Sequence, residues 1–478
     1  MTMSTAQTAI SARNAPLEAF GALAPGLPGS GTDWIDGLRR DAIERFAKSG
    51  LPNRRLEAWK FTRLGALEKH ALAPRPAATA PELGTAPPQL PAHIAPENCA
   101  ARLVFIDGRL APELSQFPSQ GKGLTITTLA AALNENPGFA EGHLSTTKDA
   151  AGALWDLNAA FMTDGAVVAL DQGAKVDQPI ALCHVATGIK SGAAHLRNLF
   201  ILGEDAQASI IETYIDAGAD DGPNKGADKG NAETPRFTNT VSDIALGKGA
   251  ALTHLRVQAQ GTQSIHTSRA VVDIAAGAAY NSFALALGSL ISRQETDAVF
   301  SGPGGNARLY GAYLGRERQL LDHTTRVDHA HPDCTLVESF RGVLDERAHG
   351  VFQGLIRVAP HATGTDARMK NQSLLLSDRA VTDTKPELEI LNDDVKCAHG
   401  ATVGDIDADA LFYLMSRGIG EATARGMLIT GFIGELINDF GDFGDGGLAG
   451  HLDEWVTRWQ DRDPRLSAPG KSGGPTDV

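Results

Sequence analysis

The sequence predicts a mainly β protein whose core is a β-solenoid, with α-helical regions before and after it. Short β-rich runs such as "GAVVALDQGAKV" and "LFILGEDAQASIIETYI", separated by Gly, Asp and Asn, fill residues 165–404. Small residues follow the turns of this region at a nearly constant spacing in the sequence. Residues outside it show the apolar periodicity of amphipathic helices.

The turns of the β-rich region recur about every 28 residues. The aligned positions are Ala250, Ala278, Ala307, Cys334 and Ala362, and Ala208 is in phase once the polar insertion at residues 217–235 is discounted. A unit this short cannot bury its own apolar face, so successive units must stack into a solenoid. The alternative is a β-sandwich with evenly spaced hairpins, which is disfavoured because Asn-Gly hairpin turns are scarce.

Residues 1–100 are expected to form an N-terminal helical region that ends in a Pro/Ala-rich linker. The stretch "TDWIDGLRRDAIERFAKSGLP" has a helical apolar stripe, with Thr32 placed to cap its start and Gly50 its end. "NRRLEAWKFTRL" is also helix-like, whereas "APRPAATAPELGTAPPQLPAHIAP" has the composition of a linker or an extended wrap. Residues 101–164 form a connecting segment of strand and helix that begins with a strand and turn in "ARLVFIDGRL".

Residues 405–462 are expected to form a C-terminal helical region. Asp407 can cap a first helix, and Gly418 with Gly420 separate it from a second one. Apolar stripes mark the second and third helices, and they comprise Met427, Phe432, Leu436, Phe440, Leu448, Leu452, Trp455 and Trp459. Three short helices bury little apolar area alone, so they should dock on the solenoid or on a partner. Residues 463–478 have the composition of a disordered tail.

Composition and charge exclude several classes of protein. The 478 residues carry a formal net charge of −14, which opposes a phosphate backbone, so nucleic acid is not an expected partner. No apolar run approaches the roughly 20 residues that span a bilayer, and no secretory signal is apparent, so we expect a cytoplasmic protein without membrane association. The four cysteines lie far apart without a CxxC pair, which disfavours a disulfide framework or a self-sufficient zinc or cluster site.

No motif of a common enzyme class is present, so the common hydrolase chemistries are not expected. A phosphate loop would end in Lys-Ser/Thr before a helix, and "SGPGGNARLYG" lacks the lysine, so the chain is not expected to bind ATP. The "GxSxG" elbow and the "HExxH" helix are also absent. A β-solenoid that acts on polysaccharides would need a groove of carboxylates or basic residues and usually a secretory signal, and neither is visible.

Two stretches combine cysteine and histidine, the residue types that bind zinc or iron. The first, "LDHTTRVDHAHPDCTL", contains His323, His329, His331 and Cys334. A turn at Pro332 and Asp333 would direct its cysteine away from the histidines. In the second, Cys397 and His399 share one face of an expected last strand. Two ligands cannot hold a metal tightly, although a second chain could complete the site; the alternative is a buried cysteine beside a histidine bonded to backbone.

The long stretch "TDTKPELEILNDDVKCAHGATVGDIDADALFYLMSRGI" is the most distinctive part of the chain. It resembles the SufB/SufD family, the β-helical proteins of the Suf iron–sulfur cluster assembly complex, and the resemblance covers about residues 165–440. "NRRLEAWKFTRL" and the glycine after histidine in "CAHGAT" resemble the SufD branch, because SufB usually has an acidic residue there. The resemblance implies that the solenoid over residues 165–404 is a right-handed parallel β-helix.

The same resemblance implies partners and a site. The chain would pair with SufB through their β-helices and dock the ATPase SufC on residues 405–462. The family's functional histidine maps onto His399, which would face a SufB cysteine and share a transient iron–sulfur cluster or iron; Cys397 is a secondary candidate ligand. The isolated chain could instead pair with a second copy of itself. The alternative role is a purely structural adaptor that stimulates SufC without touching the cluster.

Overall fold

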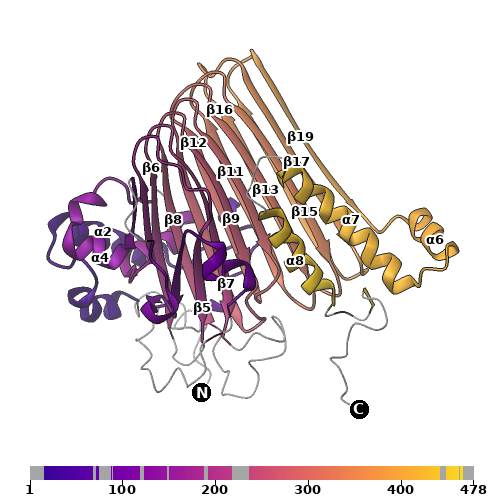
Figure 1. Cartoon of the computed structure of the whole chain (residues 1–478), viewed down its shortest axis with the longest axis horizontal. Helices are drawn as coiled ribbons and strands as arrows, with labels where there is room; N and C mark the ends of the chain where they lie inside the picture. Colours follow the sequence, from indigo (N-terminus) through magenta and orange to yellow (C-terminus); the bar gives the residue numbers. More distant parts are fainter. Residues whose placement is uncertain are drawn as a thin grey trace.

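The computed structural model describes residues 16–67, 72–74, 88, 90–118, 123–147, 150–187, 192–217, 236–441, 448–461, 463 and 465–466. Most of these residues form two facing sheets whose strands alternate along the chain, so that each coil contributes one strand to each sheet (Figure 1). The Pro/Ala-rich linker is described only in part. The polar insertion at 217–235 and the expected tail lie almost wholly outside the described residues.

We name the two sheets A and B. In the described chain, sheet A consists of β3 (Leu124–Thr128), β4 (Ala166–Leu170), β6 (Ala193–Leu202), β8 (Arg236–Leu246), β10 (Ser264–Ile274), β12 (Ile291–Phe300), β14 (Leu320–His329), β16 (His349–Val358) and β18 (Val381–Ile390). Sheet B consists of β2 (Arg109–Leu110), β1 (Ala101–Ile106), β5 (Ile180–Ala186), β7 (Gln207–Asp216), β9 (Ala251–Gln258), β11 (Ala279–Ala286), β13 (Asn306–Gly315), β15 (Thr335–Leu344), β17 (Thr365–Leu375) and β19 (Val395–Gly404).

The pairing confirms the solenoid and excludes the sandwich. From β4 to β18 and from β5 to β19, every strand pairs in parallel with the strand of the next coil, whereas hairpins would pair antiparallel. Ala251 lies opposite Ala279, which gives this coil 28 residues.

Three of the predicted positions are out of register. Gln207 pairs with Ala251, Asn306 with Ala279, and Asp366 with Thr335. The residues equivalent to Ala250 are therefore Ala206, Gly305 and Thr365, and the predictions of Ala208, Ala307 and Ala362 are wrong by two or three residues.

The turns between coils explain the small residues at these positions. Ala250 and Ala278 each donate their backbone N–H to the carbonyl three residues earlier, and both side chains are buried at a corner. The residues before them, Gly249 and Gly277, have φ of 68° and 66°, a left-handed conformation that favours glycine. The sequence repeat of about 28 residues therefore arises from one tight turn in each coil.

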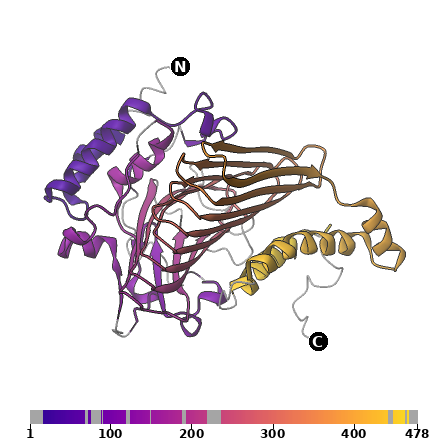
Figure 2. The ribbon, with the colours of Figure 1, turned by 90° about the horizontal axis from the view of Figure 1, so that it is seen from above.

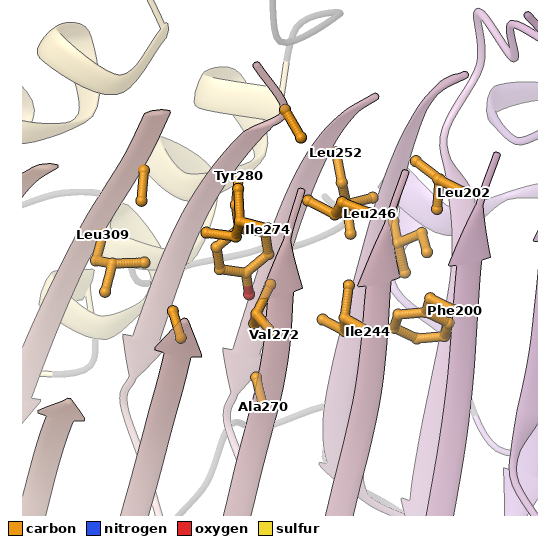
Figure 3. Close-up of a cluster of buried hydrophobic side chains, with 14 of the residues drawn as sticks. Phe200, Leu202, Ile244, Leu246, Leu252, Ala270, Val272, Ile274, Tyr280 and Leu309 are labelled. Atoms are coloured by element: carbon orange, nitrogen blue, oxygen red, sulfur yellow. The ribbon is translucent and has the colours of Figure 1, made fainter. Parts of the chain in front are cut away.

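Apolar side chains from both sheets fill one half of the solenoid interior (Figure 3). Side chains from neighbouring strands of sheet A, such as Phe200, Ile244 and Val272, stack along the axis and face Leu252 and Tyr280 of sheet B. Each coil thus buries its inward row against the coils on either side of it, and burial of this apolar area is the main stabilising contribution.

Helices and short 3₁₀ turns cover the N-terminal end of the solenoid. They are η1 (Ala24–Gly26), α2 (Asp33–Ser49), η2 (Glu57–Trp59), η4 (Ala92–Ile94), η5 (Pro96–Asn98), η6 (Pro112–Leu114), α4 (Leu129–Glu135), η7 (Pro137–Phe139), η8 (Ala150–Gly152) and α5 (Ala153–Phe161). Helix α2 begins after Thr32 and ends at Gly50 as predicted, although the Thr32 side chain makes no capping hydrogen bond.

The prediction of a helix in "NRRLEAWKFTRL" is wrong, because only the 3₁₀ turn η2 forms there. Trp59 is fully buried, donates from Nε1 to the carbonyl of Ala151, and lies beneath the Arg293 guanidinium, 4.0 Å from its ring centroid. These contacts with other elements outweigh the local helix preference of the segment.

The C-terminal helices are α6 (Ala408–Ser416), α7 (Glu421–Gly441) and α8 (Leu448–Asp461). Asp407 caps α6 as predicted, by accepting hydrogen bonds from the N–H groups of Asp409 and Ala410. The second half of α7 packs with α8 against sheet B, where Leu436 and Phe440 are buried. The first turns of α7 lie beside α6, away from the sheets (Figure 2). The assignment of Met427 to the buried stripe is wrong: its side chain is 48% exposed, whereas Ala424 and Ile429 of the neighbouring turns are buried, so Met427 lies on the uncovered side of the helix. Among the described helices, none combines the length and the apolar character needed to cross a membrane.

Candidate functional site

The candidate site lies on β19, the last strand of sheet B. Met369 of β17 lies opposite His399, and Ala367 lies opposite Cys397. Ala367 and Met369 belong to the interior core, so the same alternation points Cys397 and His399 toward the solenoid axis. The sequence prediction that these two residues share one face of a last strand is confirmed.

These two side chains face inward, but in the described chain no coil follows to cover them. Strands β18 and β19 are the terminal strands of their sheets (Figure 1). His399 is exposed and Cys397 is half-buried, whereas the equivalent residues one coil earlier are buried. We call this surface the open end, and define it by the inward-facing residues Thr382, Thr384, Pro386, Leu388, Ile390, Val395, Cys397, His399, Ala401 and Val403.

The open end carries apolar side chains beside the two candidate ligands. Val403 and Ile390 are 49% and 39% exposed, although their counterparts in the preceding coil, Ser373 and Val358, are buried. Among the described residues, each terminal strand also has one backbone edge without a neighbouring strand. Free backbone edges next to exposed apolar residues are a surface that pairs readily with another chain.

The chemistry of the two donors differs. Partial burial raises the pKa of the Cys397 thiol above its ordinary value, so this thiol is neutral near pH 7 and must lose a proton before it can bind a metal. His399 is exposed and presents an imidazole to any group that approaches the open end. No set of three or more His, Cys, Asp or Glu side chains is arranged for metal binding within the described residues, so an iron site here needs donors from elsewhere.

A buried polar network lies directly beneath the open end, and sequence reasoning missed it. Tyr313 Oη donates to Asn371 Oδ1 over 3.1 Å and contacts Ser373 Oγ at 2.9 Å. Asn371 Nδ2 in turn donates to Thr384 Oγ1 over 3.1 Å. These bonds join β13, β17 and β18, and so they hold the last two coils together. The signal available in the sequence was the run of four polar residues "KNQS" in β17, because two of the four must face inward.

The structure does not bring the other histidine stretch together as a site. His323 and His329 lie inside the solenoid, where burial lowers their pKa to about 3 and about 4, and both are therefore neutral. Cys334 is buried at a corner, within hydrogen-bonding distance of the carbonyls of Gly302 and Pro332. His331 instead stacks edge-on against His361 of the next turn. Three of the four residues therefore serve the core and its turns.

The fold is a parallel β-solenoid whose last described coil is left uncovered at the open end. Residues 184–432 match the family model described as "SUF system FeS cluster assembly, SufBD core domain". The chain therefore belongs to the SufBD family of the Suf iron–sulfur cluster assembly system, and within that family it is most similar to SufD.

Relatives from three bacteria illustrate the similarity. The chain is 29% identical to the iron–sulfur cluster assembly protein SufD of Escherichia coli, over 84% of this chain and 88% of that protein. It is 31% identical to an iron–sulfur cluster assembly SufBD family protein of Synechocystis, over 84% and 86% of the two chains. With SufD of Bacillus subtilis the identity is 25%, over 85% and 90%.

Proposed function

We propose that this protein is a SufD-like subunit of a cytoplasmic SufBCD scaffold, on which an iron–sulfur cluster is built as cargo. In this proposal the open end pairs with SufB, the C-terminal helices dock the ATPase SufC, and His399 supplies one ligand of a site shared with SufB. One observation carries the proposal: His399 belongs to the inward row of the solenoid but is left exposed at its end.

The open end is suited to pairing with a partner because it combines free backbone edges with exposed apolar side chains. A partner strand would satisfy the free backbone edge of β18 or β19 and would cover Val403 and Ile390. The same contact would enclose His399 between two chains, where the partner's side chains could complete the coordination of iron. When SufB is absent, a second copy of this chain is the expected occupant of the same surface.

The donor set suits transient binding. A neutral imidazole is a weaker ligand for iron–sulfur clusters than a thiolate, so a cluster held partly by His399 can be passed on more readily than one held by thiolates alone. Cys397 is a secondary candidate, because binding through its sulfur would first require removal of the thiol proton. The partner's cysteine is the expected thiolate ligand.

The free part of the C-terminal region fits a docking role. Four large apolar side chains on α6 and the start of α7 are exposed, namely Phe412, Tyr413, Met415 and Met427, and Phe412 is 73% exposed. Exposed apolar patches of this kind mark binding sites for other proteins. SufC is the proposed partner, and it would supply the ATP site for which this sequence has no phosphate loop.

ATP-driven movement of SufC would reach the open end through α7. Arg341 of β15 donates hydrogen bonds to the carbonyl of Phe432 and, over 2.6 Å, to the carboxylate of Glu435. Rotation of the helices would act on the solenoid through these contacts, open the pairing with SufB, and expose His399 and its partner cysteine to iron and sulfide.

The test is to co-express the chain with SufB and SufC, purify the complex and reconstitute it anaerobically with iron and sulfide. The His399→Ala variant should form the complex but should lose most of the cluster absorption. The matched control is His361→Ala, which removes an exposed histidine at the turn between β16 and β17 and should reconstitute like the unmodified complex. An equal cluster in all three complexes would reduce this chain to a structural adaptor.

A further inference from the structure

A short segment of the N-terminal region crosses the outer face of sheet A. Trp59 is fully buried against this face, and its ring centroid lies 4.0 Å from the Arg293 guanidinium of β12. Thr62 donates a hydrogen bond to Asp322 of β14, and both side chains are buried. We call residues 57–62 the N-terminal strap, and these contacts fix one end of it to β12 and β14.

The other end of the strap reaches the last strand of the same sheet. The carbonyl of Ala58 accepts a hydrogen bond from Gln353 Nε2 of β16 over 3.2 Å. The carboxylate of Glu57 accepts one from Lys385 Nζ of β18 over 2.6 Å. Gln353 and Lys385 lie opposite each other in the register of the two strands, so two successive residues of the strap join β18 to β16.

The contact of the strap with β18 is weaker than its contacts with β12 and β14. The Glu57 side chain is 67% exposed and the Lys385 side chain is 24% exposed. The Lys385 ammonium lowers the pKa of the Glu57 carboxyl below its ordinary value, so both groups are charged near pH 7. Because salt screens an exposed ion pair of this kind, the pair can break while Trp59 and Thr62 stay in place.

Strand β18 depends on such contacts more than the other long strands of sheet A do. It is the last strand of the sheet, so within the described residues it has a neighbouring strand on one side only. None of its residues is buried, whereas most residues of β16 are. Strands with few buried contacts open locally more often than the rest of a fold. Glu57, which lies 328 residues earlier in the chain than Lys385, therefore adds to the local stability of β18.

We propose that the N-terminal strap is a releasable brace that holds β18 against β16 and thereby sets how often this strand opens. With the strap closed, β18 stays paired along its length and its free backbone edge is formed. With the contact between Glu57 and Lys385 broken, the strand frays and offers less of that edge to a partner at the open end. The proposal goes beyond the proposed function, since it concerns the isolated chain and requires neither SufB nor His399.

Hydrogen exchange of the isolated chain, followed by mass spectrometry, tests the brace. In Glu57→Gln the peptides that cover β18 should exchange about two- to fivefold faster, because loss of an exposed ion pair shifts an opening equilibrium by about that factor. Glu57→Lys should speed this exchange further, and about 1 M salt should remove the difference between Glu57→Gln and the unmodified chain. The matched control is Glu387→Gln, which removes a carboxylate 2.9 Å from the same Lys385 ammonium but leaves the strap attached. Its β18 peptides should exchange like those of the unmodified chain.

Four results would overturn the proposal. Unchanged exchange of β18 in both Glu57 variants would show that the strap does not hold this strand. Equal acceleration in Glu387→Gln would make the effect one of charge beside Lys385 rather than of the strap. Acceleration that extends equally over β10 to β16 would show a general loss of stability. Size-exclusion chromatography accompanies each measurement, and a variant with a changed oligomeric state would assign the effect to association between chains.

Discussion

His399 and Met369 lie opposite each other in the register of β19 and β17, yet Met369 is 2% exposed and His399 is exposed. Both side chains point toward the solenoid axis. The difference arises because another coil covers Met369, whereas none in the described chain covers His399. A core position of the repeat has thereby become a surface position that another chain can reach.

This relationship predicts opposite effects on stability for the two side chains. Met369→Ala should lower the free energy of unfolding by about 2–5 kcal/mol, because it leaves a cavity in the interior core. His399→Ala should change it by no more than about 0.5 kcal/mol, as is usual at an exposed position. Urea denaturation of the isolated variants provides the measurement. A large loss in His399→Ala would mean that the side chain supports the fold, and would remove the basis for the cluster test.

The raised pKa of Glu338 predicts that the stability of the fold depends on pH. This residue is buried in the solenoid, where its hydrogen-bonding partner is the Thr325 hydroxyl, and burial raises its pKa from 4.5 to about 8. Between these two values the folded chain holds a proton that the unfolded chain has lost, so this carboxyl makes stability fall as pH rises from about 4.5 to about 8.

The variant Glu338→Gln should remove that contribution. At pH 8 it should be more stable than the unmodified chain by a few kcal/mol, and the advantage should shrink as pH falls toward 4.5. Thermal melts of both proteins across this pH range measure the difference in their stability. The other titrating groups are the same in both proteins, so their contributions cancel in this difference. An advantage that stays constant with pH would show that Glu338 does not titrate in this way.

The N-terminal segment contacts a buried ion pair of sheet A through Thr62 and forms an exposed ion pair with the same sheet through Glu57. Asp322 accepts hydrogen bonds from Thr62 and from Arg293, and both charged side chains are almost fully buried. Asp322→Ala should cost about 3–5 kcal/mol, because it leaves the Arg293 guanidinium buried with fewer partners. Lys385→Ala, which breaks an exposed pair with Glu57, should cost less than about 1 kcal/mol. Equal losses in chemical denaturation would contradict this account.

Gly342 and Gly400 differ in the space available for a side chain, because Gly342 is closely packed and Gly400, on the last strand, is not. A Cβ atom on Gly342 would lie 2.2 Å from the Tyr313 ring, so Gly342→Ala should destabilise the fold by about 1–3 kcal/mol. A Cβ atom on Gly400 would have no neighbour within 4 Å in the isolated chain, so Gly400→Ala should leave stability unchanged. If Gly400→Ala nevertheless weakens co-purification with SufB, the partner must approach this strand closely, whereas unimpaired pairing would place the contact elsewhere.

Much of the fold could be predicted because it rests on local chemistry. The corner turns need small residues and glycines with positive φ, so Ala250 and Ala278 recur with the coil and reveal the solenoid. The errors lie where distant contacts decide the outcome. Burial of Trp59 against Arg293 replaced a helix by a single 3₁₀ turn. The exposure of Met427 depends on which side of α7 its neighbours cover, and an apolar stripe alone does not show this.

By itself, the sequence determined the repeat, the flanking helices and the alternation that places Cys397 and His399 on one face of a strand, because turn chemistry and side-chain periodicity act over a few residues. Only the tertiary structure decided that this face is the inward one and that β19 ends its sheet. Whether an inward side chain is core or surface depends on the presence of the next coil. For that reason Met369 is buried, whereas His399, at the equivalent position of the last described coil, is exposed.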